Sequence, residues 1–293
     1  MGITADKIAK AIIAQERSGV IDLSSYRAAK ESINKAHLDK DRLGELLAGG
    51  YDPAHAVFIY TQNFVSFLSE TISVLKELRQ FARIVEKAQD EYIPSFPPMS
   101  PLTTSYFTMW ALFDVLFGQS NETIGTCIQR IAKEIDFPHW VLDAVDAMQN
   151  SRMGFYIHCG LEDGYVCLRE IGTRDIKRCY SSSGYKGTEG QIWFARLVAP
   201  SNSLVTYHVV MTTPYVLVET TEKMISAYLA REIARIGGKH LPRGKDAQTF
   251  VMKHGPSLNH WNEYIFCAYS NFQRDVVFLS CIPDLKESLR CAS

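Results

Sequence analysis

The residues of this chain best suited to holding an anion lie between positions 231 and 245. The stretch REIARIGGKHLPRGK contains six basic side chains and only one acidic side chain, Glu232. Two of its arginines are four residues apart and would share a helix face, whereas the rest fall in a loop punctuated by Gly and Pro. Cations are favoured at a helix C-terminus by the helix dipole, so the stretch predicts either a solvated helix end or a site for a polyanion such as a phosphate backbone. The candidate ligand-binding residues are Arg231, Arg235, Lys239, His240, Arg243 and Lys245.

Three glycines at a spacing of three, Gly184, Gly187 and Gly190, precede an almost unbroken apolar run. Phosphate-binding glycine loops open a helix, because the helix N-terminus supplies the aligned N–H groups. The apolar run from 192 to 198 instead predicts a strand, and the nearest cation, Lys186, lies between the glycines rather than after them. The pattern therefore favours a turn and bulge over a phosphate site.

No pattern that is typical of a metal, a cofactor or a serine nucleophile occurs in the chain. HExxH, CxxC and GxSxG motifs are all missing from the sequence, so we expect neither a metal nor a cofactor. A Cys–His nucleophile, formed by Cys267 or Cys281 with His254 or His260, remains an alternative. Both cysteines stand in apolar runs, where a thiol is usually inert.

The composition indicates a globular protein with charge divided unevenly along the chain. Of the 293 residues, 46% are hydrophobic and 22% are charged, which is ordinary for a globular chain. Residues 1–150 carry 14 Lys+Arg against 19 Asp+Glu, and residues 151–293 carry 17 against 13. The C-terminal half is therefore the better partner for an anion.

Cysteine usage and hydropathy predict a location inside the cell and no membrane insertion. The seven cysteines are irregularly spaced and follow no secretory signal, a pattern that suits reduced thiols in a cytoplasm. The most apolar stretch, 106–118, is too short to span a bilayer and includes Asp114.

The first 150 residues predict helices separated by Gly and Pro. Two modest helices are expected over 4–18 and about 24–38, and Asp52 followed by Pro53 is a strong start for a third. No Gly or Pro interrupts 54–91, which predicts one long helix. Its near-heptad apolar stripe either packs inside its own domain, which we favour, or forms a dimer coiled coil. Three more helices are expected over 103–117, 121–135 and 138–149. The stripe consists of Val57, Phe64, Leu68, Leu75, Leu78, Ala82 and Val85, with Thr61 and Thr71 as weaker members.

Beyond residue 150 the pattern changes to short strands. Turns at Asp163–Gly164 and at 172–175 separate the first three strands, and 192–198 reads as a central strand with two more around Pro214. Six short strands predict a small barrel or curled sheet at about 152–220. Helices at 221–236, 246–253 and 257–269 and one apolar strand at 275–281 follow.

These observations predict an α+β protein, in which an N-terminal helical region precedes a small antiparallel β barrel-like module with flanking helices. We expect a helical domain over 1–150 and a mixed β/α domain over 151–293. The predicted function is that of a cytoplasmic, non-catalytic binding or regulatory protein. Its helical half would contact a protein partner or a second copy, and its β half would contact the ligand. The alternative is an enzyme acting on phosphate esters or nucleic acid through the 231–245 segment, with His240 or His254 as general base.

Overall fold

The computed structural model describes residues 5–7, 10, 40–72, 78–93, 100–131, 139–201, 205–237 and 246–285. These residues form two compact units. The first unit comprises Met1–Val85, Ala111–Gln149 and Ser201–Val205, and the second comprises Glu86–Trp110, Asn150–Pro200 and Thr206–Ser293. The α+β class with a barrel-like module is confirmed, whereas the division into domains at residue 150 stays a prediction.

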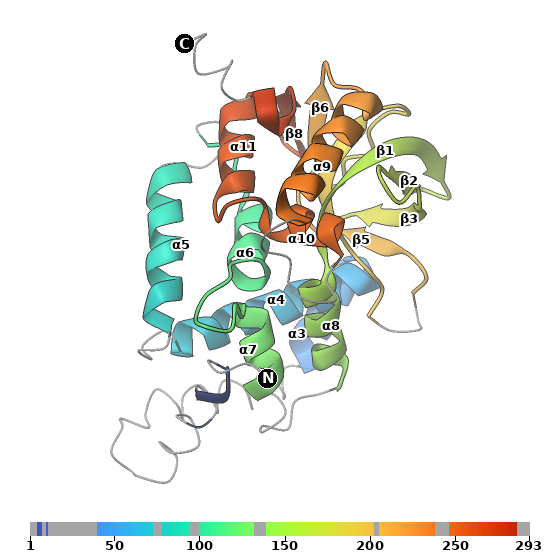
Figure 1. Cartoon of the computed structure of the whole chain (residues 1–293). Helices are drawn as coiled ribbons and strands as arrows, with labels where there is room; N and C mark the ends of the chain where they lie inside the picture. The colour runs from blue at the N-terminus through green and yellow to red at the C-terminus, as the bar shows by residue number, and fades with distance from the viewer. Residues whose placement is uncertain are drawn as a thin grey trace. The chain divides into compact units, whose positions relative to one another are not determined.

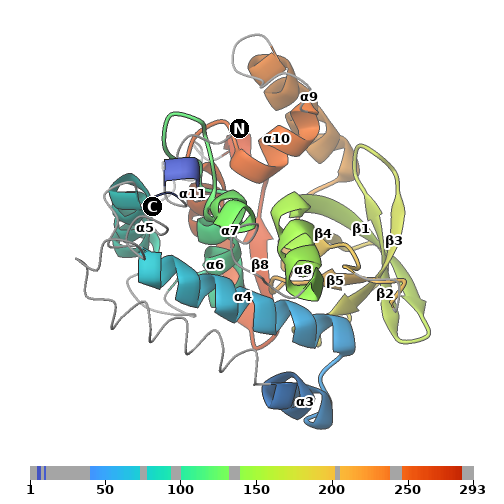
Figure 2. The ribbon, with the colours of Figure 1, turned by 90° about the horizontal axis from the view of Figure 1, so that it is seen from below.

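Most described residues of the first unit are helical, and Phe117 and Glu122 form an isolated antiparallel β-bridge. The backbone N–H of His55 donates to Asp52 Oδ1 at 3.0 Å, so Asp52 caps the helix whose start it predicts. That helix packs beside the one that begins at His139, and the rings of Tyr60 and Trp140 are 5.2 Å apart (Figure 2). The unit's helices are α3 (Lys40–Ala48), α4 (Pro53–Ile72), the first half of α5 (Arg79–Tyr92), α7 (Ile124–Ile131) and α8 (His139–Asn150).

Some expectations for the helical region need correction. The uninterrupted helix expected over 54–91 is not one element, because α4 ends at Ile72 and α5 begins at Arg79. Residues 73–77 between them lie outside the described residues, as do most residues of the two helices expected before residue 40. Helix α3 was not predicted. In α4 the side chains of Phe58, Thr61, Val65 and Leu68 are buried within the single chain.

The second unit contains the barrel, and its first strand begins at Arg152, directly after α8. Six strands follow one another, as the alternating sequence predicts: β1 (Arg152–Glu162), β2 (Tyr165–Glu170), β3 (Ile176–Ser181), β4 (Ile192–Val198), β5 (His208–Val210) and β6 (Tyr215–Val218). Positive φ angles at Asp163 and Gly164 confirm the tight turn between β1 and β2.

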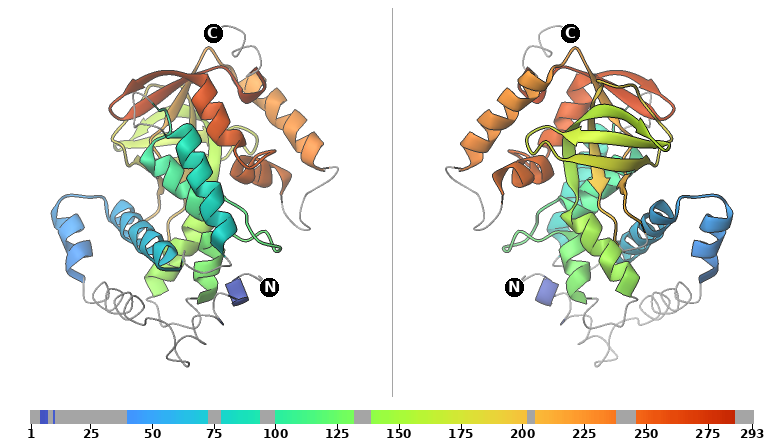
Figure 3. Two further views of the ribbon diagram at one scale, coloured as in Figure 1. Left: turned by 90° about the vertical axis from the view of Figure 1, so that its left-hand side faces the viewer. Right: turned by 90° about the vertical axis from the view of Figure 1, so that its right-hand side faces the viewer.

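Strands β1 to β5 close into a barrel in the order β1-β2-β3-β5-β4, with β4 pairing back onto β1 (Figure 3). The neighbouring strands β4, β1, β2 and β3 lie side by side in the spatial order of a Greek key. All pairings within the barrel are antiparallel except that of β3 with β5, which is parallel. That pairing joins segments far apart in the chain and completes the closure.

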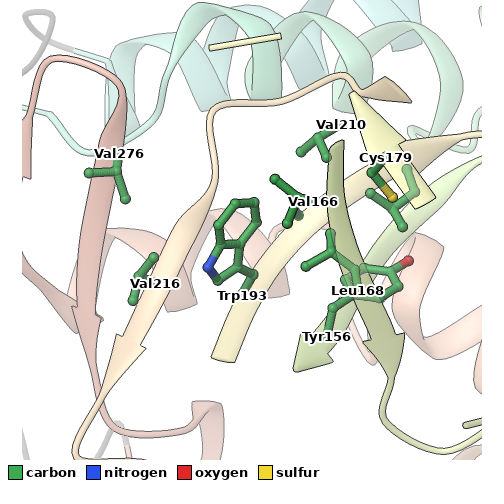
Figure 4. Packing of buried hydrophobic residues seen from close by; sticks show 10 residues of the cluster. Tyr156, Val166, Leu168, Cys179, Trp193, Val210, Val216 and Val276 are labelled. Atoms are coloured by element: carbon green, nitrogen blue, oxygen red, sulfur yellow. The ribbon is translucent and has the colours of Figure 1, made fainter. Parts of the chain in front are cut away.

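The interior of the barrel is filled with side chains (Figure 4). Trp193, at 0% exposure, lies at its centre, and apolar residues from each strand surround it. The cluster comprises Tyr156, Val166, Leu168, Cys179, Trp193, Ala195, Leu197, Val210, Val216 and Val276. Small barrels are commonly packed in this way, so ligand contact is expected on the outer surface.

Helices and three further strands, β6, β7 and β8, flank the barrel (Figure 1). Phe155 and Phe194 stack at 4.8 Å on the outer side of β1 and β4, and Trp261 covers them. The single apolar strand expected at 275–281 is paired on both sides, because it lies parallel to β6 and antiparallel to a strand that the sequence analysis missed. These elements are α6 (Thr104–Phe113), α9 (Glu222–Gly237), α10 (Ala247–His254), α11 (His260–Ala268), β7 (Tyr269–Gln273), β8 (Val276–Ser280) and a short 3-10 helix (Pro283–Leu285).

Candidate functional site

The three glycines before β4 turn the chain, as predicted. Gly184, Gly187 and Gly190 have φ angles of +85°, +64° and +87°, a region that side chains with a Cβ rarely adopt. At Gly187 an added Cβ would lie only 2.5 Å from Cζ2 of Trp193, so this glycine also lets the loop approach the barrel core. The loop leads into strand β4 and opens no helix.

Side-chain hydrogen bonds fix the same loop against one end of the barrel. Gln191 Oε1 accepts from the backbone N–H of Thr188 at 3.1 Å and from Trp193 Nε1 at 3.2 Å. Lys186 Nζ donates to the backbone oxygen of Gly164 at 2.6 Å. The loop thereby places the cation of Lys186 at the β1–β2 turn, next to Tyr165.

The outer face of β2 and β3 carries the most chemically varied side chains of the barrel. Val166 and Leu168 on β2 and Cys179 on β3 belong to the core, so the residues between them point outward. The burial of β2 follows this alternation without exception. The outward residues are Tyr165, Cys167 and Arg169 on β2 and Arg178 and Tyr180 on β3.

Two aromatic rings and one guanidinium meet on this face. The guanidinium carbon of Arg178 lies 4.4 Å from the centre of the Tyr165 ring, a cation–π contact. The rings of Tyr165 and Tyr207 are 4.7 Å apart. Tyr207 directly precedes β5, whose parallel register with β3 places it beside Arg178. We call Tyr165, Arg178 and Tyr207 the Arg178 site.

Among the described residues, Arg178 lacks the carboxylate partner that Arg152 and Arg169 have. Arg169 forms a bidentate ion pair with Glu222, both contacts at 2.9 Å, and Arg152 pairs with Glu170 at 2.7 Å. Within the described part of the chain, Arg178 makes no ion pair, and its Nε is buried without a hydrogen-bond partner. A buried donor of this kind is satisfied when a ligand oxygen binds, and guanidinium suits phosphate oxygens especially well.

Of the predicted anion site, the structure describes only Arg231 and Arg235. Arg231 pairs with Asp284, and Arg235 pairs with Glu232 at 3.1 Å, so both positive charges already have a carboxylate beside them. The other four predicted residues, Lys239, His240, Arg243 and Lys245, lie outside the described residues. Anion binding by this segment therefore stays a prediction.

Helix α9, which carries Arg231 and Arg235, also provides the tyrosine of a tyrosine–histidine pair. Tyr228 is fully buried, and its hydroxyl is 2.7 Å from Nε2 of His260 at the start of α11. Burial, and then the charge of Glu232, raise the pKa of Tyr228 well above its ordinary value. The hydroxyl of Tyr228 consequently stays protonated at neutral pH.

The predicted Cys–His nucleophile gains little support from the described cysteines. Burial, and then the nearby Cys267, raise the pKa of the Cys281 thiol, and a protonated thiol is a poor nucleophile. His260 is engaged with Tyr228. Among the described residues, no group of three or more His, Cys, Asp and Glu side chains is arranged to hold a metal ion.

Comparison of this chain with protein-family models, with curated proteins and with solved structures finds no match. No described helix is long and apolar enough to cross a membrane. The function is therefore inferred from the geometry of the site. The Arg178 site is not apparent from the sequence, because its residues come from three separate segments and share no local spacing.

Proposed function

We propose that this protein is a non-catalytic binding protein whose ligand is single-stranded nucleic acid, held by the Arg178 site on the outer face of the barrel. The observation that carries the proposal is the guanidinium of Arg178, stacked on Tyr165 at 4.4 Å, with a buried Nε that has no partner among the described residues. Such a group can donate a hydrogen bond to a phosphate oxygen or lie flat against a base.

The architecture of the barrel supports an outer-face site. Because the interior is packed with side chains, a polymer can contact only the outside. Five-stranded Greek-key barrels of the OB type bind oligonucleotides and oligosaccharides on the face of their second and third strands and with the adjoining loops. The Arg178 site occupies the corresponding face here.

The residue types at the site favour nucleic acid over a neutral sugar. Proteins that bind single strands without strong sequence preference combine aromatic rings, on which bases stack, with cations along the backbone path. Tyr165 and Tyr207 supply aromatic surface, and Arg178 supplies a charge. Lys186, held at the neighbouring β1–β2 turn, adds a second cation.

The location and the protein contacts that the sequence predicts are also part of this proposal. We propose a cytoplasmic location, based on the irregular cysteine spacing. We retain protein-partner contact or self-association through the helical half as a proposal. The alternative, an enzyme acting on phosphate esters or nucleic acid through residues 231–245, is supported less, since Arg231 and Arg235 are paired with carboxylates.

The test is fluorescence anisotropy with labelled single-stranded DNA and RNA, duplex DNA and a sulfated oligosaccharide, each titrated with the full chain. We expect the single strands to bind most tightly. Arg178→Gln should weaken that binding about tenfold, since one stacked contact is worth roughly 1–3 kcal/mol. Removing one phosphate contact should also flatten the salt dependence by about 0.7 in the log–log slope.

The matched control is Arg274→Gln, which removes the same charge from an exposed position in the β7–β8 turn of the same unit. It should leave affinity and slope nearly unchanged. Equal losses of affinity in Arg178→Gln and Arg274→Gln would show that the nucleic acid is attracted to net charge alone and would overturn the proposed site. Failure of every nucleic acid to bind at low salt would overturn the proposal as a whole. Tightest binding by the sulfated oligosaccharide would replace nucleic acid with an acidic sugar as the ligand class.

A further inference from the structure

Two cysteines face each other across the first hairpin of the barrel, beside the Arg178 site. In the β1–β2 register His158 is opposite Leu168 and Leu161 is opposite Val166, so β1 has one extra residue between these pairs. Cys159 and Gly160 therefore both oppose Cys167 in a β-bulge. Gly160 has φ +106°, which allows the bulge to form.

The register brings these thiols within the reach of a disulfide. The flanking pairs His158–Leu168 and Leu161–Val166 hold the two strands at the usual antiparallel separation of about 4.5–5.5 Å between Cα atoms. Disulfides bridge Cα separations of about 4.4–6.8 Å. Cys159 is exposed. Cys167 Sγ donates to Oε2 of Glu162 at 3.8 Å, and Glu162 is an outward residue of β1. Both sulfurs therefore lie on the outer surface of the hairpin.

The two thiols have different surroundings. Cys159 is exposed, and its sulfur lies close to the guanidinium of Arg169. Cys167 is partly buried, and burial followed by the charge of Glu162 raises its pKa. Cys159 is accordingly the thiol that meets an oxidant in solution, and Cys167 lies beside it.

We propose that Cys159 and Cys167 form a modification site, at which a peroxide oxidises the two thiols to a disulfide across the β1–β2 bulge. The sulfur of Cys159 attacks one peroxide oxygen, the O–O bond breaks, and the other oxygen leaves as water, which gives a sulfenic acid. The sulfur of Cys167 then attacks the sulfenic sulfur, the S–O bond breaks, and a second water leaves. Two thiols are oxidised and one peroxide is reduced to two waters.

Cys167 is the cross-strand partner of Arg178, so the disulfide would lie directly next to the Arg178 site. The oxidation itself does not depend on the proposed function. Among the other described cysteines, Cys127 and Cys179 are fully buried, and burial raises the pKa of the Cys127 thiol to about 12. Cys267 and Cys281 are partly buried and serve as an internal comparison.

The experiment is peptide mass spectrometry of the reduced full-length protein after treatment with one equivalent of hydrogen peroxide and then iodoacetamide. Trypsin releases both cysteines on one peptide, residues 153–169, because no Lys or Arg lies between Arg152 and Arg169. We expect this peptide to carry no alkyl label and to be lighter by two hydrogens than the reduced peptide. Reduction before alkylation should restore two labels.

Three variants sharpen the result. Cys159→Ser and Cys167→Ser should each abolish the unlabelled, lighter peptide, whereas Cys267→Ser should leave its formation unchanged. Full alkylation of both cysteines after peroxide would overturn the proposal. So would a sulfinic or sulfonic acid at Cys159 without the internal link, or a link from either cysteine to a different thiol.

Discussion

Arg178 and Tyr165 are diagonal neighbours across the β2–β3 pair, and the guanidinium carbon of Arg178 lies 4.4 Å above the centre of the Tyr165 ring. The strand register fixes this relationship, because Cys167 is opposite Arg178 and Tyr165 is two residues before Cys167. The ring holds the guanidinium against the barrel without neutralising its charge. An anion that binds here meets a cation whose side chain is already ordered, so less conformational entropy is lost on binding.

The contact between Arg178 and Tyr165 should be measurable in the free protein. Partly exposed cation–π contacts contribute about 0.5–1 kcal/mol. A double-mutant cycle with Arg178→Gln and Tyr165→Leu, followed by urea unfolding, should return a coupling energy in that range. Strictly additive effects of the two changes would contradict the stacked arrangement.

The glycines before β4 should differ in their tolerance of a side chain. Gly184→Ala meets open space and should cost only the left-handed backbone strain, about 1–2 kcal/mol. Gly187→Ala has the same strain and also places a Cβ 2.5 Å from Trp193, which should add about 1–3 kcal/mol of overpacking. Urea unfolding followed by tryptophan fluorescence compares the two variants. Equal costs would show that Gly187 does not pack against Trp193.

The ion pair between Arg169 and Glu222 predicts a pH-dependent contribution to stability. The hydrogen bonds from Arg169 lower the pKa of Glu222 below its ordinary value of 4.5. A carboxyl group with a lowered pKa in the folded state stabilises the fold above its ordinary pKa, and this stabilisation is lost as the pH falls through the lowered value. The pair is partly exposed, so its contribution is about 0.2–1 kcal/mol.

The corresponding comparison is wild type against Glu222→Gln in thermal unfolding from neutral to acidic pH. Wild type should be the more stable at neutral pH, and the difference should shrink as the pH falls below 4.5. A difference that is constant over the whole range would mean that the charge of Glu222 contributes nothing.

The apolar stripe of α4 should behave as an internal core. Leu68 is 7% exposed within the single chain, so Leu68→Glu places a charge where it cannot be solvated. We expect loss of helical circular dichroism and a lower melting temperature. Asn63→Glu, at an exposed position of the same helix, should have little effect. If Leu68→Glu instead converted a dimer into a folded monomer in sedimentation, the stripe would be a seam between two chains.

Local patterns predicted much of this fold from the sequence. The alternation in β2, the Asp163–Gly164 turn and the apolar run of β4 are each set by neighbouring residues, and the structure confirms them. Strand β7 was missed because its sequence, YSNFQ, belongs to an edge strand and is mostly exposed, so no apolar alternation marks it.

Long-range relationships could not be predicted in the same way. The parallel pairing of β3 with β5 depends on barrel closure, and no local signal encodes it. The Arg178 site depends on that pairing, because Tyr207 reaches Arg178 only through it. In the sequence, the alternation of β2 indicates that Tyr165 points outward, but it does not indicate which residues lie beside Tyr165.

The most direct test of the proposed function is photo-cross-linking of the full chain to a single-stranded oligonucleotide that carries a photoreactive base, followed by identification of the linked peptides. We expect links to the strand β2 peptide containing Tyr165 or to the peptide containing Tyr207, and their loss in Arg178→Gln but not in Arg274→Gln. Cross-links confined to residues 231–245, or cross-links at the β2–β3 face that persist in Arg178→Gln, would contradict it.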